Sequence, residues 1–136
     1  MKIVILADVW TEALGGAIGV AYHHAVGLAR RGHAVTVVTT RGPVQPPDGV
    51  TVRVVRTNIP PRYSAYLGLH NPTAIKQVSR ILQQVQPDVV HAHNLYQGLA
   101  YRSLVAARRY APRVLLTTHD VMSFAYAKLT HFINPK

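Results

Sequence analysis

The chain has 136 residues, 49% of them hydrophobic, and its 15 Lys and Arg against 5 Asp and Glu give a formal net charge of +10. This length suits one domain with a substantial core, and the composition excludes a disordered or fibrous chain. The absence of cysteine excludes disulfides, thiolate metal sites and cysteine nucleophiles. No apolar run approaches the roughly 20 residues of a membrane-spanning helix or forms a signal-peptide core, so a cytoplasmic location is expected.

From the amino terminus, the chain first predicts a strand, a helix and a second strand. Lys2–Ala7 is a nearly continuous aliphatic run that Asp8 ends, which is typical of a buried parallel strand. After a glycine-containing loop, the apolar spacing predicts a helix over Ala17–Arg31, and Gly32 suits its left-handed C-cap. Ala34–Thr40 is a second aliphatic strand, so the three elements form a βαβ unit with a right-handed crossover.

The middle of the chain predicts one more strand, an irregular segment and a helix. Val50–Val55 alternates as a strand does. Thr57–His70 contains two prolines and has no strong period, so we expect an irregular surface segment there. Asn71 can cap a helix whose first position is Pro72, and this helix is predicted to extend to about Gln84.

The last part of the chain adds two strands and completes the fold prediction. Val89–Ala92 is a fourth strand, Gly98–Tyr110 a helix and Arg113–Thr118 a fifth strand, while Val121–Phe132 is compatible with a further helix. This order predicts one Rossmann-like, doubly wound α/β domain over residues 1–136, with a mostly parallel sheet and helices on both faces.

Acids and glycines follow the predicted strands, where open parallel sheets bind their ligands. Asp8, Glu12 and Asp120 are three of the five acids and lie just after strands. Gly15 and Gly16 precede the first helix, where they allow a ligand close to the backbone and where free amides favour phosphate, although a plain structural turn explains them as well. The glycines come late and no acid ends the second strand, which disfavours NAD binding.

Two histidines share one face of the fourth strand. His91 and His93 have strand spacing, and two neutral imidazoles could hold a metal with Asp8 or Asp120 as a third ligand. A packed, hydrogen-bonded histidine is the more common arrangement. We therefore expect His93 to be exposed at the edge of the sheet, His91 to be structural, and no metal to be bound.

His119 and Asp120 end the fifth strand. His119 can donate to a phosphate or sugar hydroxyl, and an imidazole exchanges protons near neutral pH. Asp120 suits a functional role or the N-cap of a following helix equally well.

Several segments together resemble a known family. They are Gly15–Gly16, the helix end Leu28-Ala29-Arg30-Arg31-Gly32-His33, the strand Val35–Thr40, and the stretches Pro87-Asp88-Val89-Val90-His91-Ala92-His93-Asn94 and Thr117-Thr118-His119-Asp120. Their order and spacing are similar to the N-terminal domain of GT-B retaining glycosyltransferases of family four.

The resemblance implies an enzyme that transfers a sugar from a nucleotide-sugar donor to an acceptor hydroxyl with retention, without cofactor or metal. It implies that Gly15 and Gly16 approach the donor phosphates or sugar, and that His119, with Asp120, lies at the transferred sugar. The acceptor, a sugar, lipid or small molecule, would meet the segments Thr57–His70 and His93–Gln97. The acceptor-side candidates are Asp8, Glu12, His93 and Asn94.

The family pattern also includes a second Rossmann-like domain, which binds the nucleotide and carries paired glutamates. These residues contain no such domain, and Glu12 is their only glutamate. We therefore expect an acceptor-side domain of a longer chain that does not turn over alone.

Other function classes stay open. One is a GT-B-like sugar-nucleotide epimerase, and another is a metal-dependent hydrolase using His91, His93, His119 and Asp120. A third is a non-catalytic module whose basic face docks on an anionic membrane or a partner. Because the arginines are dispersed and no RNA-binding signature is present, nucleic acid is not an expected partner.

Overall fold

The computed structural model describes residues 1–11, 16–43 and 45–120. Five strands form one sheet in the order β3-β2-β1-β4-β5, and every pair is parallel. The strands are β1 (Lys2–Ala7), β2 (Ala34–Thr39), β3 (Val50–Val54), β4 (Val89–His93) and β5 (Arg113–Thr117). The predicted Rossmann-like α/β fold is confirmed, with a sheet that is wholly parallel in the part of the chain described.

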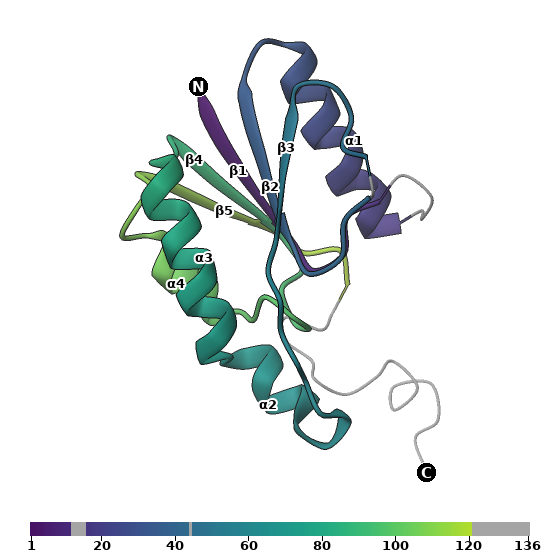
Figure 1. The fold of residues 1–136 in the computed structure, drawn as a ribbon, viewed down its shortest axis with the longest axis vertical. Helices are drawn as coiled ribbons and strands as arrows, with labels where there is room; N and C mark the ends of the chain where they lie inside the picture. Colours follow the sequence, from purple (N-terminus) through teal and green to yellow (C-terminus); the bar gives the residue numbers. More distant parts are fainter. Residues whose placement is uncertain (12–15, 44, 121–136) are drawn as a thin grey trace.

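Helices cover both faces of this sheet (Figure 1). The helix α1 (Gly16–Arg30) lies on one face, and α3 (Pro72–Val85) and α4 (Arg102–Ala107) lie on the other. The short helix α2 (Ser64–Leu69) lies beyond the carboxyl ends of the strands. Within the described ranges, no helix has both the length and the apolar character required to cross a bilayer.

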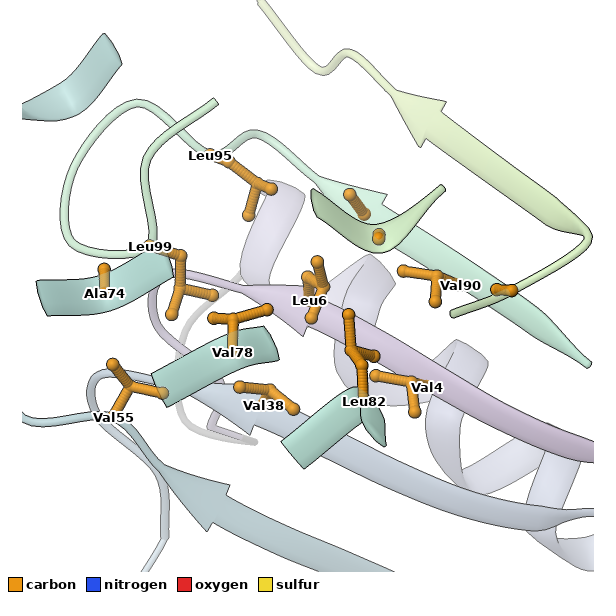
Figure 2. Packing of buried hydrophobic residues seen from close by; sticks show 13 residues of the cluster. Val4, Leu6, Val38, Val55, Ala74, Val78, Leu82, Val90, Leu95 and Leu99 are labelled. Carbon is orange, nitrogen blue, oxygen red and sulfur yellow. The ribbon is translucent and has the colours of Figure 1, made fainter. Parts of the chain in front are cut away.

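The alternation of side chains along β1 builds two separate cores. Ile3 and Ile5 pack with Ala21 and Ala25 of α1. The alternate residues of β1, Val4 and Leu6, face α3 and α4 instead. Figure 2 shows them packed with Val78 and Leu82 of α3 and with Val90 of β4. Because β1 is central and buried on both faces, its sequence is a continuous aliphatic run.

The same alternation along β4 decides where its histidines lie. Val90 and Ala92 belong to the core on the α3 side. His91 and His93 therefore project from the opposite face, the one that α1 covers. This places two imidazoles beside α1 at the end of the strand where ligands bind in parallel sheets.

The start of α3 forms as its sequence predicts. The Asn71 side chain accepts a hydrogen bond from the Ala74 amide at 3.2 Å, and Pro72 occupies the first helical position. The helix ends at Val85, one residue beyond the predicted end, and Gln86 closes it in a left-handed conformation with a φ of 48°.

The structure differs from the predicted secondary structure in two segments. The segment Thr57–His70 is not irregular throughout, because it contains a 3-10 turn, Pro61–Tyr63, followed by α2. The helix predicted over Gly98–Tyr110 is shorter, since α4 covers only Arg102–Ala107. The physical reason is that Ala100 adopts a left-handed φ of 63°, which breaks the helix before it can extend back to Gly98. The possible helix over Val121–Phe132 lies outside the described residues.

Candidate functional site

The register of the parallel strands brings the predicted polar residues to one edge. Ala7 of β1 lies opposite His93 of β4, and His93 lies opposite Thr117 of β5. The residues that follow these strands, Asp8 after β1 and Asn94 after β4, therefore emerge at the same level. His119 and Asp120 come two and three residues after Thr117 and complete the group.

His93 is buried, with 3% of its surface exposed, so the expectation that it would be exposed was wrong. Its ring lies between those of His91 and His119, at centroid distances of 4.3 and 5.2 Å. Nδ1 of His93 is 2.9 Å from Nε2 of His119. Burial, followed by the three nearby histidines, lowers the pKa of His93 to about 3, so the ring is neutral at physiological pH.

His91 is half-buried and makes the hydrogen bond expected of a positioned side chain. Its Nε2 lies 2.8 Å from Oγ1 of Thr117 on the neighbouring strand. Its ring centroid is 5.7 Å from that of His24, which projects from α1. Burial, and then repulsion from His24 and His119, lower the pKa of His91, so this ring also favours its neutral form.

Asp120 is the centre of a hydrogen-bond network. Its Oδ2 accepts from Nδ2 of Asn94 and from the hydroxyl of Tyr96, both at 3.0 Å. Oδ1 of Asn94 in turn accepts from the His119 amide at 3.1 Å. Burial, and then the hydrogen bond and charge of Asp120, raise the pKa of Tyr96 to about 12. The network holds the turn after β5 against the turn after β4.

Asn94 has the backbone conformation that this network requires. Its φ of 42° is left-handed, a region in which asparagine is several-fold enriched over most residues. The sequence indicated Asn94 as a site residue but did not single out Tyr96. A possible signal was the position of Tyr96 three residues after β4, in a loop that follows a parallel strand.

Asp8 anchors the chain that follows β4. Its two carboxylate oxygens accept from the amides of Gln97, at 2.9 Å, and Leu99, at 2.7 Å. Its side chain is 8% exposed. Burial raises the pKa of Asp8, while the backbone hydrogen bonds act in the opposite direction. Asp8 thus holds the loop after β4, which lines the site, in place from the protein interior.

A cleft lies between the carboxyl edge of the sheet and α2. Val9 and Arg41 line it from the segments that follow β1 and β2, Ser64 and Ala65 from α2, and Tyr96 and Gln97 from the loop after β4. The two segments expected to meet an acceptor, Thr57–His70 and His93–Gln97, therefore contribute to one concave surface. Both polar and apolar side chains line it, which suits a ligand with hydroxyls and a carbon framework.

Gly16 begins α1, and its φ of 64° is a conformation that glycine adopts without strain. Among the described residues, and apart from its own helix backbone and chain neighbours, no atom lies within 4 Å of a Cβ added to Gly16. Gly15 and Glu12, which the sequence also indicated, lie outside the described residues.

The histidine group includes a member that sequence reasoning missed. His24, His91 and His93 each place one ring nitrogen within 4.8 Å of the others. Asp8 and Asp120, which the sequence offered as a third ligand if a metal were bound, are not part of this group, because Asp8 binds backbone amides and Asp120 binds Asn94 and Tyr96. The available signal was the position of His24, which directly precedes the buried Ala25 on α1.

The comparisons with known proteins agree with the geometry. A family model described as Glycosyltransferase Family 4 matches residues 14–135, which include α1, β4, β5 and the residues that follow them. A comparison with curated proteins found no match. Because the match extends over well more than half of the residues, the chain belongs to glycosyltransferase family 4.

Proposed function

We propose that this domain forms the acceptor side of a retaining glycosyltransferase that uses a nucleotide-sugar donor. The observation that carries the proposal is the placement of His119 and Asp120 at the carboxyl edge, next to the cleft that both expected acceptor segments line. Tyr96 connects the two, since it lines the cleft and donates to Asp120. An acceptor in the cleft would thus lie beside the residues that meet the transferred sugar.

The imidazole of His119 is positioned for hydrogen bonding to a sugar. Its Nε2 pairs with Nδ1 of His93, and its amide is held by Asn94. The other ring nitrogen, Nδ1, is then left to pair with a sugar hydroxyl. The ring is held at Nε2 and the backbone of the same residue at its amide, which keeps the imidazole oriented as a preorganised polar group.

The start of α1 offers a place for the donor diphosphate. Gly16 opens the backbone there, and the first turn of α1 carries no acid that would compete for its amides. Negative charge develops on the leaving diphosphate during transfer, and a helix amino terminus stabilises such charge. The transfer proposed here needs no resident cofactor.

The nucleotide itself requires a further binding surface. We propose a second, nucleotide-binding domain that faces this edge, as the resemblance implies, so that donor and acceptor meet between the two domains. Turnover would then be a property of the full-length protein, and this domain alone would bind ligands without transferring sugar.

The two other enzyme readings receive less support. An epimerase needs no acceptor, yet the structure has a cleft where an acceptor would lie. In a metal-dependent hydrolase, a metal ion bound by Oδ2 of Asp120 would have to compete with the hydrogen bonds that this oxygen already accepts from Asn94 and Tyr96.

The test is nucleotide release and sugar transfer by the full-length protein with His119→Ala. We expect turnover to fall by about 100-fold or more, as when one preorganised donor is lost, with the fold intact. The matched control is His33→Ala, in the turn after α1 and outside the site. Wild-type rates in His119→Ala would contradict the proposal, and so would inversion at the anomeric carbon of the product, measured by NMR.

We also propose an anionic membrane surface as the setting of a lipid acceptor. Tyr63, Tyr66 and Leu69 are exposed beside the cleft, and the Arg62 guanidinium lies 4.5 Å from the ring centre of Tyr63. Aromatic and basic groups together favour a headgroup layer. Sedimentation with vesicles containing phosphatidylserine should show binding that falls with salt and is weakened by Tyr66→Ser. Vesicle binding that changes neither with salt nor in Tyr66→Ser would contradict the proposed membrane contact.

A further inference from the structure

We propose that His24, His91 and His93 form a binding site for a late transition-metal ion, of which Zn²⁺ is the representative. Each of the three residues places a ring nitrogen within 4.8 Å of the others. The site is distinct from the proposed glycosyl transfer, which uses His119 and needs no metal.

The strongest observation is a buried polar atom without a partner. Nε2 of His93 is buried and has no hydrogen bond within the described part of the chain, although the Nδ1 of the same ring pairs with His119. A buried polar group without a hydrogen-bond partner destabilises a protein. Coordination of a metal by this nitrogen would satisfy it, and we assign Nε2 of His93 as the first ligand.

The other two histidines approach His93 from two different elements. His91 precedes it by two residues on β4, and their ring centroids are 4.3 Å apart. His24 projects from α1, with its ring centroid 5.3 Å from that of His93. A metal at this point would connect helix and sheet. Since the side chain of His24 is exposed, its ring can rotate to reach the ligand spacing of about 3.4 Å that Zn–N bonds of about 2.0–2.1 Å imply.

The donor set suits a late transition metal, because all three candidate ligands are imidazoles. Imidazole ligands select zinc, copper, nickel or cobalt, whereas calcium and magnesium require oxygen ligands. In the part of the chain that the structure describes, no carboxylate belongs to the group, which disfavours a hard cation.

Metal binding would also act on His119 through a shared proton. When Nε2 of His93 holds a metal, the proton of that ring must lie on Nδ1. His93 then donates to Nε2 of His119 across the 2.9 Å contact. This arrangement, in which a ligand imidazole passes its remaining N–H to a second group, is typical of protein metal sites. The metal would fix the tautomer of His119 without touching it.

The experiment is calorimetric titration of the tag-free domain with ZnCl₂ at neutral pH, for the wild type and for His24→Ala. His24 is exposed on α1, and alanine favours the helix, so this variant should fold. We expect one zinc per chain in the wild type. The affinity of His24→Ala should be lower by about 100-fold or more, because even groups outside the ligand shell change it by about 10–100-fold. His33→Ala, which removes a histidine outside the group, should bind as the wild type does.

Nitrogen-15 NMR of the imidazole rings identifies the ligands directly. Zinc should shift one nitrogen of each of His24, His91 and His93, and in His93 the shifted nitrogen should be Nε2. Absence of stoichiometric binding would overturn the proposal. So would an affinity that His24→Ala leaves unchanged, or shifts confined to other histidines. None of these readouts depends on sugar transfer, so the metal site and the proposed function fail or succeed separately.

Discussion

Nδ1 of His93 lies 2.9 Å from Nε2 of His119, and this contact joins the ends of β4 and β5 through two imidazoles. The first ring is buried in the protein and the second is half-buried at the carboxyl edge. A change in the protonation of the buried ring is therefore transmitted to the residue that we place beside the sugar.

The stability of the domain should fall as the pH falls below neutrality. The folded protein keeps His93 unprotonated down to a pKa of about 3, whereas the unfolded chain takes up this proton near 6.5. Lower pH therefore favours the unfolded chain, and stability is lost as the pH falls through this window. Between pH 7 and pH 5 the loss from this residue is about 2 kcal/mol.

Urea unfolding of the wild type and of His93→Gln measures this loss. The variant should lose clearly less stability between the two pH values. The raised pKa of Asp8 acts with the opposite sign in both proteins, so the difference between their profiles isolates His93. Parallel profiles would contradict the prediction.

The ionisation of Tyr96 should depend on Asp120. Asp120→Asn removes the negative charge next to the Tyr96 hydroxyl, so the pKa of Tyr96 should fall from about 12. It should stay above 10, because burial is the largest cause of the shift. The Cζ carbon of Tyr96, followed by NMR across this pH range, measures the change, and the exposed Tyr66 is the internal reference. A Tyr96 that titrates identically in both proteins would show that the hydrogen bond is absent in solution.

Asp8→Asn should loosen the loop after β4. An asparagine side chain offers one oxygen where two amides, those of Gln97 and Leu99, now each have a carboxylate oxygen. Loss of a hydrogen bond to a charged group destabilises by about 1.5–3 kcal/mol. Hydrogen exchange at the Leu99 amide should become faster in the variant. The control, Asp48→Asn at an exposed position, should leave it unchanged.

Gly98→Ala should destabilise the same loop for a different reason. A Cβ at Gly98 would clash with the side chain of Thr40. Thr40 cannot move freely, because its hydroxyl donates to the Asp8 carbonyl at 2.5 Å. We expect a loss of about 1–3 kcal/mol in the free energy of unfolding.

Gly27→Ala is the matched control for this glycine. Gly27 lies inside α1, and no other part of the described chain comes within 4 Å of a Cβ added there. Alanine should stabilise the helix there by about 1 kcal/mol. Thermal unfolding of both variants tests the prediction. Equal shifts of the same sign in the Tm would contradict the contact between a Cβ at Gly98 and the side chain of Thr40.

Local patterns were sufficient to predict most of the fold. The aliphatic run of β1 and the Asn71–Pro72 start of α3 depend on neighbours in sequence, and both formed as predicted. The helix before β5 was predicted too long, because the left-handed turn at Ala100 is part of a loop whose amides are held by Asp8 from the other end of the chain. No local pattern contains that contact.

The sequence predicted at which edge of the sheet the site lies, but not which side chains contact one another there. Asp8, Asn94, His119 and Asp120 follow strands, and the parallel register brings them together. The burial of His93 and its approach to His24 depend on how α1 packs across the sheet, which spacing along either element does not determine. For the same reason spacing along the chain did not place His24 next to His91 and His93.

The central position of β1 has a consequence for biosynthesis. This strand is made before the other described strands, yet one of its two neighbours, β4, follows so late that Ile3 pairs with Val89. At about 5–20 residues per second, the ribosome needs roughly 4–17 s to make the chain between them. During that interval an aliphatic strand has one unpaired edge, which makes the nascent chain prone to aggregation. We expect a chaperone that shields this edge until β4 emerges to raise the yield of folded protein.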